Sequence, residues 1–179
     1  MTAPQGKSTR LIRPDAAYKA SFIAAVKEFQ AEERPNYMHI DLAALEADFP
    51  AYVKSQLTHE PSVLNGVPQT NYWDVDEQGY IGRLSIRHRL NAGLRVYGGH
   101  IGYDVRPSRR REGHGTRMLA LSLLFVRELG IDQVMITCDE TNIGSRKIIA
   151  ANGGVLDKII KLDFREVPTM HWWIDLSAT

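Results

Sequence analysis

Apolar residues recur with helical spacing along the first third of the chain. Residues 10–13, with the sequence RLIR, alternate as a short strand, and Asp15 follows two positions later as a candidate helix N-cap. Between residues 16 and 33, an apolar residue every three or four positions predicts an amphipathic helix, which Pro35 stops. The chain therefore begins with a strand followed by a helix.

Helical spacing returns once more before the pattern changes to that of strands. A helical region is expected from residue 41 to about residue 57, broken in its middle, where Asp48 can cap the second piece. Residues 70–105 then alternate between apolar and polar positions, with turn signals at 76–79 and 91–93. This segment predicts an antiparallel meander of three strands.

The remaining chain mixes helices and strands. A helix from 113 to 129 is apolar around much of its circumference, so we expect it to pack on more than one side at the centre of the fold. A strand, a helix and two strands follow at 133–138, 145–152, 155–164 and 170–176. This order predicts an α/β (α+β) domain with a mixed, mostly antiparallel central sheet of six to seven strands flanked by helices. No repeat or linker divides the chain, so we expect one domain over residues 1–179.

Composition narrows the choice of partners. The 22 Lys and Arg residues nearly balance the 21 Asp and Glu residues, and the net charge of +1 predicts neither a nucleic-acid nor a membrane partner. A single cysteine, Cys138, excludes an internal disulfide and fits a reducing compartment. The first ten residues lack an apolar signal region, and we expect a cytoplasmic protein. The oligomeric state stays open, with a homodimer as one option.

The segment RRREGHG, residues 109–115, places positive charge beside glycines at a helix start. Backbone N–H groups at such a start have no intrahelical partner, and the helix dipole makes that end partly positive. Gly113 and Gly115 would let a phosphate approach these amides, and Arg110 and Arg111 would add charged hydrogen bonds. We interpret residues 110–116 as a pyrophosphate site.

Other anion-binding patterns fit this segment less well. A dinucleotide fingerprint needs a third glycine where Met118 stands, and the Gly-Lys-Ser/Thr triplet of a P-loop is absent from the sequence. One basic cluster in a near-neutral chain is weak support for nucleic-acid binding. A solvated loop shaped by its glycines is the remaining structural alternative.

At these residues the sequence resembles the GNAT acetyltransferase superfamily, whose phosphate motif Arg/Gln-x-x-Gly-x-Gly/Ala matches Arg110, Gly113 and Gly115. A second family segment, Asn-x-x-Ser, is similar to NIGS at Asn142 and Ser145. More narrowly, RHRLN and GGHIGYDVRPS resemble a bacterial branch of predicted acetyltransferases. The resemblance implies acetyl-coenzyme A as co-substrate and no metal. It implies cofactor binding by Val105, Arg110, Arg111, Gly113, His114, Gly115, Thr116, Asn142 and Ser145.

Acetyl transfer to an amine needs the neutral amine, which is only about 0.04% of an alkylammonium with a pKa near 10.4 at pH 7. His100 is the first choice for the base, although a hydrogen-bonded structural histidine is the alternative. The amide of Val105, at the end of the strand, is the best candidate to stabilise the oxyanion. His88 on the preceding strand is a neighbour of His100 in one strand register.

The departing thiolate needs an acid, and the resemblance places a tyrosine where this chain has Ile149. Tyr103 can substitute, but it shares a face with His100 only if the strand bulges at Gly102. Cys138 is another neighbour of this site, unless it is simply a small buried hydrophobe. The unusual residue at position 149 also suggests the alternative of a non-catalytic acyl-coenzyme A binding module.

The acceptor is expected to be a primary amine of a small molecule or amino-acid derivative. Glu32, Glu33 and Tyr37 are available to meet a cationic amine. Trp172 and Trp173 point to opposite faces of their strand, so one could line the acceptor cleft, although burial of both is favoured. The predicted function is an acetyl-coenzyme A-dependent N-acetyltransferase that works by direct nucleophilic attack.

Overall fold

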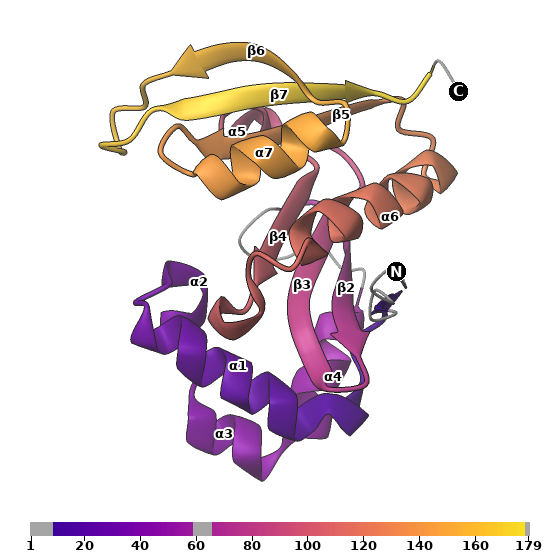
Figure 1. The fold of residues 1–179 in the computed structure, drawn as a ribbon, viewed down its shortest axis with the longest axis vertical. Coiled ribbons are helices and arrows are strands. Elements are labelled where there is room, and N and C mark those ends of the chain that lie inside the picture. Colours follow the sequence, from indigo (N-terminus) through magenta and orange to yellow (C-terminus); the bar gives the residue numbers. More distant parts are fainter. Residues whose placement is uncertain (1–8, 59–65, 178–179) are drawn as a thin grey trace, which may run out of the picture.

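The computed structural model describes residues 9–58 and 66–177 and has an elongated shape with helices at one end and a sheet at the other (Figure 1). The strands are β1 (Arg10–Ile12), β2 (Gln69–Asp76), β3 (Gly79–Arg87), β4 (Ile101–Val105), β5 (Gln133–Asp139), β6 (Val155–Ile160) and β7 (Thr169–Asp175). The helices are α1 (Lys19–Ala31), α2 (Pro35–Met38), α3 (Leu42–Ala47), α4 (Phe49–Leu57), α5 (Ala92–Val96), α6 (His114–Glu128) and α7 (Ile143–Ala151). Short 3-10 turns lie at Ala16–Tyr18 and Pro107–Arg109.

The predicted fold class is confirmed, and the strands are divided between two sheets. One sheet has the order β1-β2-β3-β4 and the other the order β5-β7-β6, and every strand pair among the described residues is antiparallel. An isolated bridge between Gly99 and Ile136 joins them. The backbone N–H of His100 donates to the carbonyl of Met135 at 2.7 Å beside that bridge. The two sheets therefore touch at one point and diverge from it.

Side-chain caps fix the N-terminal helices as the sequence predicts. Asp15 accepts a hydrogen bond from the amide of Ala17, and Asp48 accepts one from Ala51 at the start of α4. The first helix ends at Ala31, before Pro35, which instead occupies the first turn of the short helix α2. A proline at this position loses no helical hydrogen bond, because the first-turn N–H groups have no partner inside the helix.

The predicted meander is present, but its second connection is longer than a turn. The side chain of Asn91 accepts a hydrogen bond from the amide of Leu94 at 2.9 Å and caps α5, where the sequence predicted a turn. The next strand begins at Ile101 because Gly98 and Gly99 have φ angles of 119° and 63°, outside the strand region.

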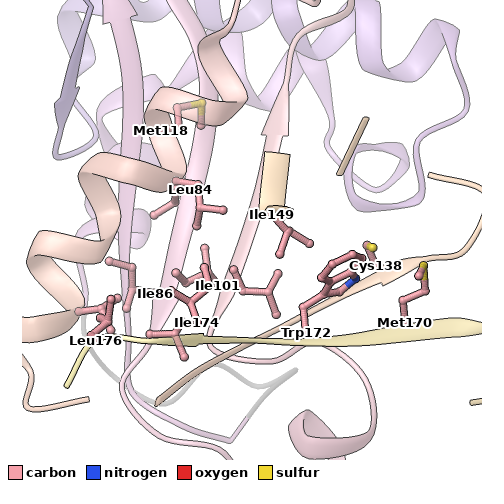
Figure 2. Packing of buried hydrophobic residues seen from close by; sticks show 14 residues of the cluster. Leu84, Ile86, Ile101, Met118, Cys138, Ile149, Met170, Trp172, Ile174 and Leu176 are labelled. Carbon is pink, nitrogen blue, oxygen red and sulfur yellow. The ribbon is translucent and has the colours of Figure 1, made fainter. Parts of the chain in front are cut away.

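Two hydrophobic clusters hold the elements together. The first joins α1, α3 and α4 to β2, where the ring of Phe22 stacks on Trp73 at 4.7 Å between centroids. The second lies between β3, β4, α6, α7 and the C-terminal sheet, and Figure 2 shows Ile149 and Trp172 within it. Helix α6 contacts both the first sheet and α7, as its apolar surface predicts, although Leu124 is left exposed.

The junction between the sheets predicts that residue 99 must be glycine. A Cβ atom there would collide with the carbonyl oxygen of Met135, and the positive φ adds strain. We expect Gly99→Val to lower the free energy of unfolding by about 2–4 kcal/mol, measured by urea denaturation. The control is Gly153→Ala, where φ is 81° and no atom lies within 4 Å of the added Cβ. Equal losses in the two variants would contradict the steric argument.

Candidate active site

A cavity of about 680 Å³ lies where the two sheets diverge. The C-terminal ends of β4 and β5, represented by Val105 and Asp139, line it together with the first turns of α6 and α7. Charged and apolar groups share its surface, because the arginine-rich loop before α6 lies opposite Tyr103 and Ile148. The predicted phosphate site and the predicted catalytic residue Tyr103 thus meet in one concave region.

The N-terminus of α6 opens into this cavity without a side-chain cap. Gly113 is the N-cap with a φ of 83°, and no side chain accepts a hydrogen bond from the first turn. No heavy atom lies within 4 Å of the position that a Cβ on Gly113 would occupy. The amides of the first turn, which include those of His114 and Thr116, are therefore available to an anion, in the partly positive end of the helix.

The second glycine of the motif has a different role from the predicted one. A Cβ atom on Gly115 would lie 2.5 Å from Cδ1 of Ile148, so this glycine lets α6 and α7 approach each other. The side-chain amide of Asn152 donates to the carbonyls of Thr116 and Ile148 and ties the same two helices together. Helix packing, more than phosphate access, requires glycine at position 115.

The three arginines before α6 differ in their partners. Arg109 donates to the buried carboxylate of Asp76 at 2.7 Å. Arg110 makes a two-pronged contact with Glu32 at 2.8 and 2.9 Å, and its Nε donates to the carbonyl of Val105. Only Arg111 has no polar side-chain partner among residues 9–58 and 66–177. Arg110, which was predicted to bind the ligand, lines the cavity and also connects the loop to Glu32 at the end of α1.

A buried network supports the loop from beneath. The ring of His114 is 4% exposed, and its Nδ1 lies 3.4 Å from Asp74 while its Nε2 lies 3.2 Å from Glu112. Burial raises the pKa of Asp74. Burial also acts to raise the pKa of Asp76, but the hydrogen bonds from Arg109 and the Gln78 amide, together with the nearby positive charges, outweigh it and lower that pKa. His114 can thus offer a ligand only its backbone amide, because its ring is held within this network.

Tyr103 is the predicted catalytic residue that reaches the cavity. Its hydroxyl lies 2.9 Å from Oγ of Ser145 in the first turn of α7. Strands β3 and β4 pair in regular register from Gly82 to Ile86, so no bulge turns His100 to the same face. Burial raises the pKa of Tyr103, which keeps its hydroxyl protonated at neutral pH.

His100 lies outside the cavity lining and joins the two sheets. Its ring is 7% exposed, and Nδ1 accepts the backbone N–H of Met135 at 3.0 Å. Burial, together with the charges of Arg95 and Arg87, lowers its pKa to about 4. The structure thus brings Tyr103 but not His100 to the cavity, and the geometry favours the structural alternative for His100. His88 directly follows β3, and its ring Nε2 lies 2.8 Å from the hydroxyl of Thr70 on β2.

Comparison with known proteins decides the family. Residues 23–155 match the family model described as Acetyltransferase (GNAT) domain. The chain belongs to the GNAT acetyltransferase family. A search of curated protein sequences gives no match.

Solved structures share the fold of this GNAT acetyltransferase at low sequence identity. The RimL ribosomal L7/L12 alpha-N-protein acetyltransferase in complex with coenzyme A is 15% identical, with a TM-score of 0.71 over 98% of each chain. The microcin C7 self immunity acetyltransferase MccE, in complex with acetyl-CoA and AMP, is 12% identical, with a TM-score of 0.68 over 97% of each chain. Mycobacterium smegmatis RimJ in complex with CoA-disulfide is 18% identical, with a TM-score of 0.64 over 93% of this chain and 80% of that one.

Several other predicted residues of this GNAT acetyltransferase lie away from the cavity. Ile149 is fully buried and points into the core, so position 149 is not where an acid would meet a ligand (Figure 2). Cys138 is also buried, which raises its pKa. Trp172 belongs to the core, whereas Trp173 is half-buried, and burial of both tryptophans was favoured. The ring of Tyr37 is buried rather than open to an acceptor.

Sequence reasoning missed a charged cluster at the edge of the cavity. Asp104 is 8% exposed and accepts hydrogen bonds from Arg34 at 2.9 Å and from Arg83 at 3.3 Å. A signal was present in the strand GRLSIR, where Arg83 and Arg87 alternate with buried apolar residues. Their carboxylate partner could not be predicted, because it comes from another strand.

The described residues contain neither a group of three or more clustered His, Cys, Asp or Glu side chains that could hold a metal ion nor a helix able to cross a membrane. Backbone amides, hydroxyls and guanidinium groups line the cavity. These groups bind and orient anions and can donate protons.

The depressed pKa of His100 predicts a pH-dependent stability. The folded value of about 4 lies below the ordinary value of 6.5, so folding disfavours the protonated ring. Its contribution is complete above pH 6.5 and is lost as the pH falls toward 4, by up to about 3 kcal/mol. We expect His100→Gln to flatten the decline in unfolding free energy over this range, measured by urea titration at each pH. His39→Gln, at an exposed histidine, is the control, and an unchanged slope in His100→Gln would refute the assignment.

Proposed function

We propose that this protein transfers an acetyl group from acetyl-coenzyme A to the primary amine of a small molecule or amino-acid derivative by direct nucleophilic attack. The observation that carries the proposal is the uncapped N-terminus of α6, which opens at Gly113 into the cavity that Tyr103 and Val105 also line. An anion site, a hydroxyl donor and a strand end are thus combined in one cavity. Neighbouring folds have been solved with coenzyme A or acetyl-CoA, which supports the choice of co-substrate.

The residues present fit the diphosphate of coenzyme A. The amides of the first turn of α6 would bind its oxygens, and Arg111 is a cation without a polar side-chain partner in the described chain. Lys147 of α7 also lines the cavity and adds a second positive charge. When bound, acetyl-coenzyme A supplies the acetyl group as a thioester.

The backbone of β4 provides a donor for the oxyanion. Arg106 N–H donates to the carbonyl of Ile81 on β3, and consecutive N–H groups of a strand point to opposite edges. The N–H of Val105 therefore points away from β3, toward the side on which β4 has no neighbouring strand. Negative charge that develops on a carbonyl oxygen there would be stabilised by this amide, which is fixed in advance.

Tyr103 is the group best placed to donate a proton. Tyr103 lines the cavity, its hydroxyl is oriented by Ser145, and its raised pKa keeps the hydroxyl protonated at neutral pH, so that it can donate a hydrogen bond to a developing thiolate. The alternative of a non-catalytic binding module was suggested by the lack of a tyrosine at position 149. This alternative loses support, because residue 149 is buried in the core whereas Tyr103 lines the cavity. The acceptor amine must enter as the neutral base, so we expect the rate to rise with pH as more free amine forms.

Glycine at position 113 is expected to decide coenzyme A binding. Gly113→Glu would place a carboxylate in the open space at the helix start, where it would compete with phosphate for the same amides. We expect at least about a 100-fold loss of coenzyme A affinity in calorimetry, with the far-UV spectrum retained. Gly130→Glu is the matched control, because it has a similar φ of 71° and open surroundings just beyond the other end of α6. Unchanged coenzyme A affinity in Gly113→Glu would contradict the proposal that the diphosphate binds at the start of α6.

The hydroxyl of Tyr103 is expected to act in the chemical step. Tyr103→Phe should lower kcat by about 10²-fold while leaving the affinity for coenzyme A unchanged, because the ring remains and only the proton donor is lost. Ser145→Ala is the control, since it breaks the same hydrogen bond but leaves the phenol. Equal losses of kcat in the two variants would mean that the hydrogen bond between Tyr103 and Ser145 matters and that the Tyr103 hydroxyl is not the proton donor.

The function itself is tested by thiol release. The purified protein is incubated with acetyl-coenzyme A and a panel of primary amines, and free coenzyme A is measured with a thiol reagent. Acetylated amine in a 1:1 ratio to released thiol is the expected result. Calorimetric binding of acetyl-coenzyme A with no thiol released by any amine would contradict the proposal.

A further inference from the structure

The sheet face opposite α6 carries a row of positive charge. On β3, Arg83, Ser85 and Arg87 alternate with Leu84 and Ile86, which are buried in the core beside α6. Because side chains alternate along a strand, the two arginines point to the other face. Gly102 and Asp104 lie directly opposite this row on β4.

Two guanidinium groups share one carboxylate at this place. Asp104 accepts from Arg34 at 2.9 Å through one oxygen and from Arg83 at 3.3 Å through the other. The side chains of Arg34 and Arg83 are 43% and 35% exposed, whereas that of Asp104 is 8% exposed. The cluster therefore carries a net charge of +1, and its positive groups are the ones that face solvent.

Arg83 has unused hydrogen-bonding capacity. Only its Nε is engaged, and within the described residues its two terminal nitrogens have no polar partner. The guanidinium lies 5.0 Å from the ring centroid of Tyr37, which fixes its orientation from one side. The terminal nitrogens of Arg83 are thus oriented so that they could donate two hydrogen bonds to one oxyanion.

Arg87 adds a second positive charge without a carboxylate partner in the described chain. Its Nη1 donates to the carbonyls of Gly98 and Gly99, which are neutral acceptors. Burial and the charge of Arg83 lower the pKa of Arg87, which reflects the proximity of the two cations. The guanidinium of Arg87 lies beside Gly102, since a Cβ there would be in ordinary van der Waals contact with its Nη2 at 3.5 Å.

The cluster reaches the active-site cavity through Arg34 and Asp104, and Arg83 adjoins the lining through its hydrogen bond to Asp104. Arg34 and Asp104 line the same cavity as Tyr103 and Gly113, and Asp104 is the next residue to Tyr103 on β4. The predicted acidic group Glu32 does not compete for the acceptor, because it is paired with Arg110. An acceptor that approaches β4 from this face therefore meets guanidinium groups.

We infer that the acceptor is a small molecule that carries a carboxylate in addition to its primary amine, and that Arg83 binds this carboxylate. The inference rests on the proposed function and adds the chemical class of the acceptor. Asp104 would hold the ammonium before it loses its proton, while the terminal nitrogens of Arg83 form a two-pronged contact with the carboxylate.

Binding in the presence of coenzyme A, which cannot react, tests the site without turnover. The probes are 4-aminobutanoate and other amino acids of increasing chain length, each compared with its neutral amide by calorimetry. We expect at least one acid to bind about tenfold or more tightly than its amide, a preference that Arg83→Gln reduces to about twofold or less and Arg83→Lys partly restores. Arg10→Gln, at an exposed arginine on β1, is the control and should keep the preference. Equal binding of every acid and amide, or a preference that survives Arg83→Gln, would overturn the inference.

The Asp104→Asn variant is expected to change the preference for the acid over its amide in the opposite direction to Arg83→Gln. It removes the negative charge from the cluster, so the preference for the acid should increase by about threefold or more. An unchanged or reduced preference in a variant that retains the wild-type melting curve would count against Arg83 as the carboxylate site.

Thiol release distinguishes this inference from the proposed function. If neutral amines and their acid counterparts are acetylated with equal kcat/KM, the acetyltransferase proposal stands and the carboxylate site is rejected. If acids bind selectively through Arg83 but no amine releases thiol, the site stands and the proposed reaction is rejected.

Discussion

The divergence of the two sheets after a single bridge is the constraint on which the active site depends. Gly99 and Ile136 pair once, and the backbone N–H and ring Nδ1 of His100 complete the contact with Met135. Beyond this point β4 pairs only with β3. No other described strand pairs with the outer edge of β4, so the N–H groups on that edge take part in no ladder there, and the ends of β4 and β5 line a cavity. A continuous sheet would have used those amides in a ladder and left no space for a thioester.

Two helix N-termini line this cavity, but their ends are satisfied differently. In α7 the side chain of Asn142 accepts the amide of Ser145 at 3.0 Å, so the second sequence motif caps its own helix. In α6 Gly113 supplies no cap, and the first-turn amides stay available. The anion site should therefore be at α6, whereas α7 contributes Ser145 to orient Tyr103. The two motifs identified by resemblance contribute to the same site through different physical roles.

Local signals in the sequence predicted most of the fold because they depend on neighbouring residues only. Aspartates 15 and 48 cap the helices they precede, and alternation marks β2 and β3 correctly. The loop at Gly113 was predictable for the same reason, since an αL glycine followed by a helix is a local arrangement. The prediction of a turn at residues 91–93 was wrong, because this segment starts the helix α5. Asn91 is common both in turns and at helix N-caps, and only tertiary contacts select between the two.

The roles of individual side chains could not be predicted where a distant partner decides them. The Nδ1 atom of His100 is engaged because the backbone N–H of Met135, 35 residues away, donates to it. Gly115 is needed because α7 packs against it, and Arg110 is occupied because Glu32 on the end of α1 faces it. None of these pairs has a fixed spacing in the sequence, so residue type alone suggested a base, a phosphate contact and a cation for the ligand.

Most arginines near the active-site cavity form ion pairs with carboxylates, so only a few positive charges there remain unpaired. Glu28 on α1 holds Arg106, and Asp76 holds Arg109, so the loop before α6 is fixed by ion pairs that do not need a ligand. Among the described residues near the cavity, Arg87, Arg111 and Lys147 have no carboxylate partner, and the terminal nitrogens of Arg83 have no polar partner. Arg111 and Lys147 line the cavity at the proposed diphosphate site, and Arg83 and Arg87 lie on the face of β3 where we propose that the acceptor carboxylate binds. A net charge of +1 is thus compatible with two separate anion subsites, because attraction at short range depends on local charge and not on the total.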